Sequence, residues 1–421
     1  MKHSSRLRHN IAALGSVQIV TYIIPLITLP YVTRVLGAEA WGTVAFTQII
    51  IGYFILMTNW GFALSGTRKV AAHRNEPERV TDIFFAIWSA QWLLCAIAIL
   101  FLTVLILFVP FFNQYAMYYL WGIGGIISSV LFPVWFLNGL ERMKQVAVIQ
   151  ITTRAAAVPL IFMLVKSPQD APLMLAIGAI TGIIGGAVTL AWINKSLGLA
   201  WRWPRKARVL DELSEGATVF GSSVWISLYT TLTPTILGLF AGNVAVGHYM
   251  LADRAKQLAQ SALTPISQAL FPRISHLFQT DSTQARALLL RSSKMILLLS
   301  ASSSVALWAL AEYIVILLAG EQFRPAITIL KWLAPLPFVI SLSNIFGVQI
   351  LLPNHKTKAF NRILVLAGAL SLVMIMPLIH WKGAEGASIN TFISESFVTL
   401  AMALYLWKTG FFVQSNNWKK A

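Results

Sequence analysis

The sequence is poor in charged residues, and this scarcity excludes most soluble folds. Only 11% of its 421 residues are charged, whereas soluble domains carry about 25%. With 57% hydrophobic residues and a mean hydropathy of +0.71, a soluble core cannot explain the composition. A transmembrane barrel would show a weak alternation of apolar and polar residues, but these apolar runs are continuous. The composition therefore predicts an all-α membrane protein.

Cysteine and the motifs of common enzyme sites are also nearly absent. The single cysteine, Cys95, lies inside an apolar run, so the chain cannot form an intrachain disulfide. We find no phosphate-binding lysine loop, no HExxH helix and no Cys/His cluster. The sequence therefore predicts no catalytic activity, no metal site and no bound cofactor.

Apolar stretches of the length that a membrane-crossing helix needs, about 20 residues, recur along the chain. The basic N-terminus precedes the first stretch without a small-residue cleavage signal, so we expect a retained first span. We predict twelve spans. Their approximate ranges are 10–34, 41–64, 82–110, 115–139, 145–166, 171–194, 215–241, 244–272, 293–318, 326–351, 359–380 and 386–407.

Basic residues alternate between the two sides of these spans. The chain has 32 Lys and Arg against 15 Asp and Glu, a net charge of +17. With the N-terminus in the cytoplasm, 24 of the 32 basic residues fall in cytoplasmic segments and about five on the opposite side. Lys and Arg favour the cytoplasmic side of membrane proteins, so we expect both termini there. Because the basic residues form no single patch, the charge does not indicate nucleic-acid binding.

The longest hydrophilic stretch, KSLGLAWRWPRKARVLDELSE, occupies 195–215 near the middle of the chain. Trp201 and Trp203 beside clustered Arg and Lys are typical of a segment at the membrane interface. This stretch predicts three parts: a six-helix bundle over 1–194, a cytoplasmic interfacial linker over 195–214, and a second six-helix bundle over 215–421.

An even number of spans in each half gives both halves the same orientation, as parallel repeats require. Gly37 and Gly42 follow the first span, and Gly242 and Gly247 follow the seventh with the same spacing. Two glycines alone are weak support for a repeat.

Several charged residues lie deep inside predicted spans, although a charge at the bilayer centre costs about 2.5–3.5 kcal/mol. At a rise of about 1.5 Å per residue, four of them fall near the midplane. These are Arg154, Asp253, Arg254 and Glu395. Cationic and anionic groups at one depth, drawn from both halves, predict a hydrated central cavity.

Each of these residues also has a structural interpretation. Arg154 could pair with Glu395 or Asp253 to hold helices together. Asp253 and Lys256 are three residues apart on one helical face and could form a local ion pair. Arg34, at the end of the first span, could be an interfacial anchor or the rim of a cavity.

Eight prolines within spans predict bends, because each removes a backbone hydrogen bond from its helix. They are Pro25, Pro30, Pro133, Pro159, Pro234, Pro265, Pro335 and Pro337. Bent helices around a polar interior suit alternating access, but they also occur in rigid bundles.

Five blocks of the sequence resemble the Wzx-type O-antigen and polysaccharide flippases of the multidrug/oligosaccharidyl-lipid/polysaccharide (MOP) exporter superfamily. They are LPYVTRVLGAEAWGTVAF (29–46), NWGFALSGTRKVA (59–71), FPVWFLNGLERMK (132–144), YMLADRAKQLAQSALTPISQALFPRIS (249–275) and PLPFVISLSNIFGVQILLP (335–353). The blocks follow the family order and cover both halves. The block at 249–275 is the most specific.

The resemblance implies two six-helix bundles around a central cavity in a bacterial inner membrane. It also implies movement of an undecaprenyl-pyrophosphate-linked oligosaccharide repeat unit from the cytoplasmic to the periplasmic leaflet. The implied partners are the lipid-linked oligosaccharide, membrane lipids, and the polysaccharide polymerase with its chain-length machinery. Arg34 and Arg254 fall in family-like blocks. Arg154 lies outside these blocks, so its predicted role depends only on its position within the fifth predicted span.

A pyrophosphate needs fixed positive groups to cross hydrocarbon, and a guanidinium supplies charge with bidentate donors. We therefore expect the pyrophosphate and cavity contacts to come from Arg34, Arg154, Arg254 and Lys256. Asp253 and Glu395 are the candidates to couple transport to H⁺ or Na⁺.

The main alternative is a multidrug or small-cation antiporter of the same superfamily, which should favour an acidic cavity. A membrane-embedded glycan enzyme would need a catalytic constellation and larger external loops than this sequence has. A passive scaffold would leave the midplane charges unexplained.

Overall fold

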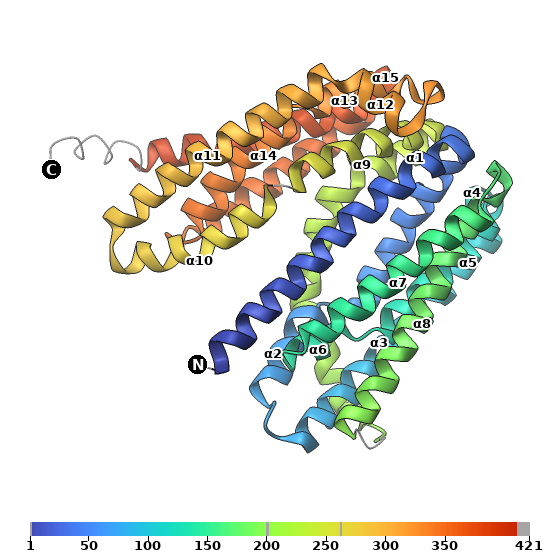
Figure 1. Ribbon diagram of the computed structural model, residues 1–421, viewed down its shortest axis with the longest axis vertical. Helices are drawn as coiled ribbons and strands as arrows, with labels where there is room; N and C mark the ends of the chain where they lie inside the picture. The colour runs from blue at the N-terminus through green and yellow to red at the C-terminus, as the bar shows by residue number, and fades with distance from the viewer. Residues whose placement is uncertain (1, 199–201, 262, 411–421) are drawn as a thin grey trace. The chain divides into compact units, whose positions relative to one another are not determined.

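The computed structural model describes residues 2–198, 202–261 and 263–410, and in this part of the chain the regular structure is helical (Figure 1). The chain divides into two compact units, Met1–Leu228 and Tyr229–Ala421. The helices before the division are α1 (Lys2–Asn59), α2 (Phe62–Ala72), α3 (Pro77–Phe108), α4 (Pro110–Asn113), α5 (Ala116–Leu131), α6 (Val134–Gly139), α7 (Met143–Leu164), the 3₁₀ turn η1 (Pro168–Asp170) and α8 (Ala171–Leu197).

Helix α9 (Lys206–Ser261) begins in the first unit and ends in the second. The later elements are α10 (Thr264–Thr280), α11 (Ser282–Ala309), α12 (Ala311–Ala319), the 3₁₀ turn η2 (Glu321–Phe323), α13 (Ala326–Leu333), α14 (Leu336–Asn344), the π-helix η3 (Ile345–Leu351) and α15 (Thr357–Lys408). The predicted division at 194 and 215 stays a prediction.

Nine helical segments of the described chain are long and apolar enough to cross a membrane. Three of them contain a glycine whose backbone leaves the helical region, namely Gly37, Gly242 and Gly383. Dividing these three at the glycines gives twelve segments, which is consistent with the twelve predicted spans. The prediction of an all-α membrane protein is confirmed.

Gly37 and Gly242 adopt nearly the same unusual backbone conformation, with φ/ψ of 75°/177° and 80°/174°. This region of φ/ψ space is essentially restricted to glycine. Each glycine follows the first predicted span of its half, and the matching conformations give the predicted repeat a structural basis.

The prolines act differently from site to site. Helices end and restart around Pro133, between α5 and α6, and around Pro335, between α13 and α14. Pro159 and Pro234 instead lie inside continuous helices. The predicted span over 244–272 is not one helix, because α9 ends at Ser261 and α10 begins at Thr264 with a proline in its first turn, a position that proline favours.

Part of the predicted linker over 195–214 is helical. Helix α8 ends at Leu197, and α9 begins at Lys206 and continues without interruption into the seventh span. Trp201 of the predicted interfacial segment lies outside the described residues.

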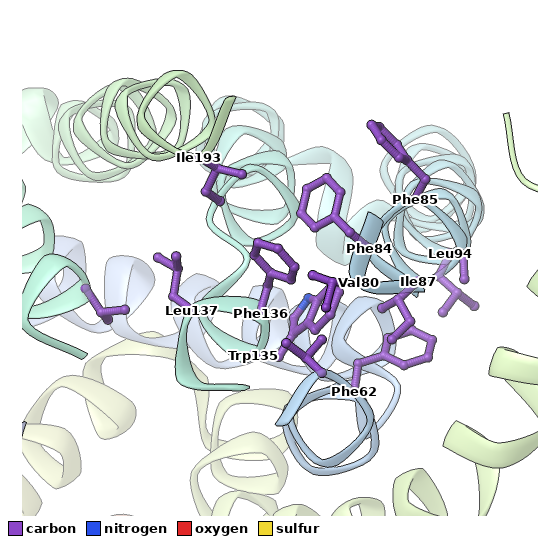
Figure 2. Packing of buried hydrophobic residues seen from close by; sticks show 13 residues of the cluster. Phe62, Val80, Phe84, Phe85, Ile87, Leu94, Trp135, Phe136, Leu137 and Ile193 are labelled. Atoms are coloured by element: carbon purple, nitrogen blue, oxygen red, sulfur yellow. The ribbon is translucent and has the colours of Figure 1, made fainter. Parts of the chain in front are cut away.

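Buried aromatic side chains of α2, α3 and α6 pack together in the first unit (Figure 2). The ring of Phe84 lies 4.7 Å from that of Phe136 and 6.1 Å from that of Trp135, between centroids. The indole Nε1 of Trp135 donates to Oε1 of buried Gln91 at 3.0 Å. Because its polar group is paired, the tryptophan can be fully packed without an unsatisfied donor.

Candidate functional site

The first unit contains a cavity of about 510 Å³ between α1, α5, α7 and α8, with the start of α6 closing one wall. Its lining comes from five elements. The lining residues are Ile24, Asn59, Ser128, Ser129, Phe132, Val134, Gln150, Thr153, Arg154, Ala157, Gly178, Thr181, Gly182 and Gly185.

Helix α7 gives the cavity its polar wall. Gln150, Thr153, Arg154 and Ala157 are spaced three or four residues apart, which places them on one face of the helix. The Arg154 side chain is exposed on this face. The side-chain amides of Asn59 and Gln150 make no hydrogen bond to any other described residue. These two amides are therefore available to a ligand.

The wall opposite, on α8, consists of small residues that let α5 approach closely. A Cβ at Gly186 would lie 2.5 Å from Cβ of Leu131, and one at Gly182 would lie 2.9 Å from Oγ of Ser128. Small residues at such spacing allow close packing of membrane helices. At Gly178, by contrast, a Cβ would meet no heavy atom within 4 Å. That position opens onto the cavity.

The charge of the lining is one-sided. Arg154 is its charged residue, and no carboxylate is among the described residues that line the cavity. The other polar groups are hydroxyls and amides, which can both donate and accept hydrogen bonds. A cationic side chain within a membrane span is energetically costly. An anionic ligand would offset the charge of Arg154, whereas a cationic ligand would not.

A second polar cluster lies in the unit Tyr229–Ala421, where α9 meets α15. The hydroxyl of Tyr249 lies 3.1 Å from that of Thr391, and Tyr249 interacts electrostatically with the carboxylates of both Asp253 and Glu395. Asp253 follows Tyr249 by one helical turn, and Glu395 follows Thr391 by one turn. The two predicted coupling carboxylates are therefore brought to neighbouring positions on adjacent helices.

Lys256 is bound to Asp253 rather than left for a ligand. Its Nζ donates to Asp253 Oδ1 at 2.5 Å, and Gln257 Nε2 donates to the other carboxylate oxygen at 2.6 Å. Lys256 and Asp253 are both buried, with 8% and 9% of their surface exposed. The local ion pair that the spacing allowed is the arrangement observed.

The other two predicted arginines lie in different units. Arg34 is exposed on α1, three residues before Gly37. Arg254 is half-buried on α9, and within the described chain its side chain forms no hydrogen bond or ion pair. The substrate-binding roles of Arg34, Arg154, Arg254 and Lys256 stay predictions.

The sequence analysis missed Asn59 and Gln150. Gln150 could have been found, because it precedes Arg154 by four residues and so shares its helical face. Asn59 is the last residue of the 58-residue helix α1. No local sequence pattern indicates that it lines the same cavity as residues of α7. Among the described residues, no group of three or more His, Cys, Asp or Glu side chains is placed to hold a metal ion.

Long apolar helices with glycine breaks that enclose a cavity with polar lining are the fold of a membrane transporter. The fold resembles that of the lipid II flippase MurJ in an inward closed conformation, with a TM-score of 0.70, 14% identity, and coverage of 94% of this chain and 87% of that one. It also resembles an inward-facing multidrug MATE-family transporter of the MOP superfamily, with a TM-score of 0.64, 13% identity and coverage of 92% and 97%.

The sequence relatives are more specific. The profile of the family described as "Polysaccharide biosynthesis protein" matches residues 7–278, and the chain belongs to this family. It is 33% identical to the "Putative O-antigen transporter" of Escherichia coli K12 over 95% of this chain and 96% of that protein. A protein of the same name from Shigella dysenteriae is 29% identical over 94% of this chain and 99% of its own length. The family resemblance found in the sequence is confirmed.

Proposed function

We propose that this protein is a flippase for a lipid-linked oligosaccharide of surface-polysaccharide synthesis. Its substrate is an undecaprenyl-pyrophosphate-linked repeat unit, which it moves from the cytoplasmic to the periplasmic leaflet of a bacterial inner membrane by alternating access. The family, the O-antigen transporter relatives and the fold shared with a lipid II flippase support this proposal. Both termini lie in the cytoplasm, and no covalent chemistry is involved.

The observation that carries the proposal is the composition of the cavity in the first unit. A pyrophosphate cannot leave water unless fixed donors replace its hydration. Arg154 supplies charge and paired N–H donors for phosphate oxygens. Asn59 and Gln150 supply amides, and the neighbouring serine and threonine hydroxyls can pair with sugar hydroxyls. The polyprenyl chain needs no polar contact and stays in lipid.

The same lining argues against the antiporter alternative. A transporter of cationic drugs needs acidic groups to offset the charge of its substrate, and the described lining contains none. The proposed phosphate contact of Arg254 depends on its positive charge, which no described residue neutralises. Lys256 is already neutralised by Asp253 and contributes to binding only if that pair opens.

A cellular experiment tests this assignment. In cells that lack the protein, we expect complementation by the wild type to restore surface polymer, and Gly178→Leu to fail because the leucine fills the cavity. Arg154→Ala and Arg254→Ala should fail as well, with single lipid-linked repeat units accumulating. Gly52→Leu is the matched control, since a Cβ there also meets no heavy atom within 4 Å but Gly52 does not line the cavity.

All variants are compared at equal amounts in the membrane. Normal surface polymer with Gly178→Leu would refute the cavity as the substrate site. Unchanged surface glycan in the deletion strain, together with new sensitivity to cationic antibiotics, would support the drug exporter instead.

We propose further that Asp253 and Glu395 couple transport to an H⁺ or Na⁺ gradient. Their proximity to Tyr249 gives an ion a carboxylate-rich position, and the bond from Lys256 to Asp253 offers a partner that ion binding would displace. In vesicles, an imposed gradient should accelerate transport by the wild type. The charge-neutral double variant Asp253→Asn/Lys256→Met should remain folded yet lose this acceleration. If an imposed gradient does not change the transport rate of the wild type, the coupling proposal is refuted, and the flippase proposal is unaffected.

A further inference from the structure

A second cavity, of about 370 Å³, lies at the start of α3 against the segment that leads into α9. Its lining carries three arginines and one carboxylate: Arg202, Arg205, Arg208 and Asp82. The remaining wall includes Phe85 and Trp203. All of these residues belong to the first unit. Nothing in the proposed transport path uses them.

The depth of this cavity is set by the sequence of α3. Asp82 is the last charged residue before a continuous apolar run, and Phe85 is already inside that run and buried. The candidate span Pro77–Phe108 has 32 residues, about 48 Å of helix at 1.5 Å per residue. This exceeds a hydrocarbon core of roughly 30 Å, so the charged first turns of α3 lie at the level of the lipid headgroups.

The three arginine side chains differ in how closely they contact carboxylates. Arg208 donates to Asp82 at 2.6 Å, whereas Arg202 lies 3.7 Å from both Asp82 and Glu78. The side chain of Arg205 forms no hydrogen bond or ion pair with the described residues. One carboxylate thus positions two guanidinium groups around the cavity, while the third remains available. The cavity keeps a net positive charge that a ligand would have to balance.

Trp203 indicates which kind of ligand the cavity would bind. Its side chain is 83% exposed, although indole is a large apolar group. Tryptophan is enriched where a membrane meets water, since its ring is apolar and its N–H is polar. An exposed tryptophan beside three arginines, at headgroup depth, fits a lipid surface better than a soluble anion.

We propose that this cavity binds the phosphate headgroup of an anionic phospholipid in the cytoplasmic leaflet. The free guanidinium of Arg205 and the loosely held one of Arg202 contact the phosphate, and Trp203 lies among the glycerol and acyl ends. Basic pockets on the cytoplasmic side of membrane proteins are suited to such headgroups. The bound lipid would tie the segment between α8 and α9 to the membrane surface.

The test uses the purified full-length protein in detergent and measures retained lipid by native mass spectrometry. Phosphatidylglycerol is the probe, with phosphatidylcholine as the zwitterionic comparison. Each basic residue near an anionic lipid surface contributes about fivefold in affinity. We therefore expect Arg205→Gln to weaken phosphatidylglycerol binding about fivefold and Arg202→Gln/Arg205→Gln roughly 25-fold.

Arg79→Gln is the matched control, because Arg79 lies on α3 close to the cavity, pairs with Glu76 and does not line the cavity. It should leave lipid binding unchanged. Arg205→Gln breaks no ion pair with the described residues, so we expect it to leave the fold of this region intact. Equal phosphatidylglycerol binding by wild type and double variant would overturn the proposal. So would an equal loss in Arg79→Gln, or full displacement of the lipid by inorganic phosphate.

Discussion

Glu215 forms ion pairs with two basic side chains of α2, and these pairs attach the start of α9 to α2. Lys69 Nζ lies 2.6 Å from Glu215 and 2.8 Å from Glu212, and Arg68 lies 2.8 Å from Glu215. The hydrogen bond from Lys69 holds the pKa of the Glu215 carboxyl below its usual value. Glu215 precedes the candidate span Thr231–Ser261 and lies outside it.

The lowered pKa predicts how stability depends on pH. The ion pairs contribute fully above the pKa of an unfolded glutamate, about 4.3. Their contribution is lost as the pH falls through the lower pKa of the folded state. Glu215→Gln should therefore be less stable than the wild type at pH 7, by an amount in the range of about 0.2–1 kcal/mol typical of exposed pairs. The difference should shrink as the pH falls below about 4.3 and vanish once the pH lies below the lowered pKa of the folded state.

Thermal unfolding in detergent at several pH values measures this difference. A gap between Glu215→Gln and wild type that persists unchanged down to pH 3 would contradict the assignment.

Residues close in sequence were easier to predict than residues far apart. The pair of Asp253 and Lys256 follows from a spacing of three on one helix, and the structure shows it. The pairs of Lys69 with Glu212 and Glu215 join residues more than 140 positions apart. No local pattern marks such a contact, because it depends on how α9 packs against α2.

Among the helices, the turns at Gly37 and Gly242 depend on a backbone conformation that favours glycine. A Cβ at Gly242 would meet no heavy atom within 4 Å, so any effect of substitution comes from the backbone alone. Holding a residue other than glycine in this conformation costs about 1–3 kcal/mol. We expect Gly242→Ala to lower the unfolding temperature accordingly.

Gly52→Ala provides the comparison, since Gly52 lies within helix α1 and its Cβ would also be unobstructed. Alanine there should be neutral or stabilising, because glycine weakens helix interiors by roughly 0.5–1 kcal/mol. Equal unfolding temperatures for the two variants would show that the turn at Gly242 is not strained by a side chain.

The sequence predicted the helices better than their ends. Apolar length and alternating basic loops were sufficient for the spans, because the membrane imposes both. The continuation of the predicted linker into α9 was missed, since charged residues there indicated a loop while the backbone remains helical. The effect of each proline was also not predictable, because a break at Pro133 and continuity at Pro159 depend on neighbouring helices.

At the scale of the whole chain, the proposed transport rests on two features. The two halves share a glycine turn, and the first half contains a cavity lined by a cationic side chain. The sequence predicted that Arg154 faces a cavity, and Arg154 does line the cavity of the first unit. It could not show that the cavity wall would include Asn59 and a glycine face of α8, because these come from separate helices. It also did not indicate that the described lining residues include no carboxylate, and this property favours an anionic substrate over a cationic one.

Reconstituted vesicles test this claim most directly. Purified protein is placed in vesicles with a fluorescent undecaprenyl-pyrophosphate-linked oligosaccharide in one leaflet, and a membrane-impermeant reagent reports its arrival in the other. The account predicts fast transfer with the wild type, transfer at the protein-free rate with Arg154→Ala, and no transfer of a cationic dye by either. Transfer of the dye but not of the glycolipid by the wild type would contradict it.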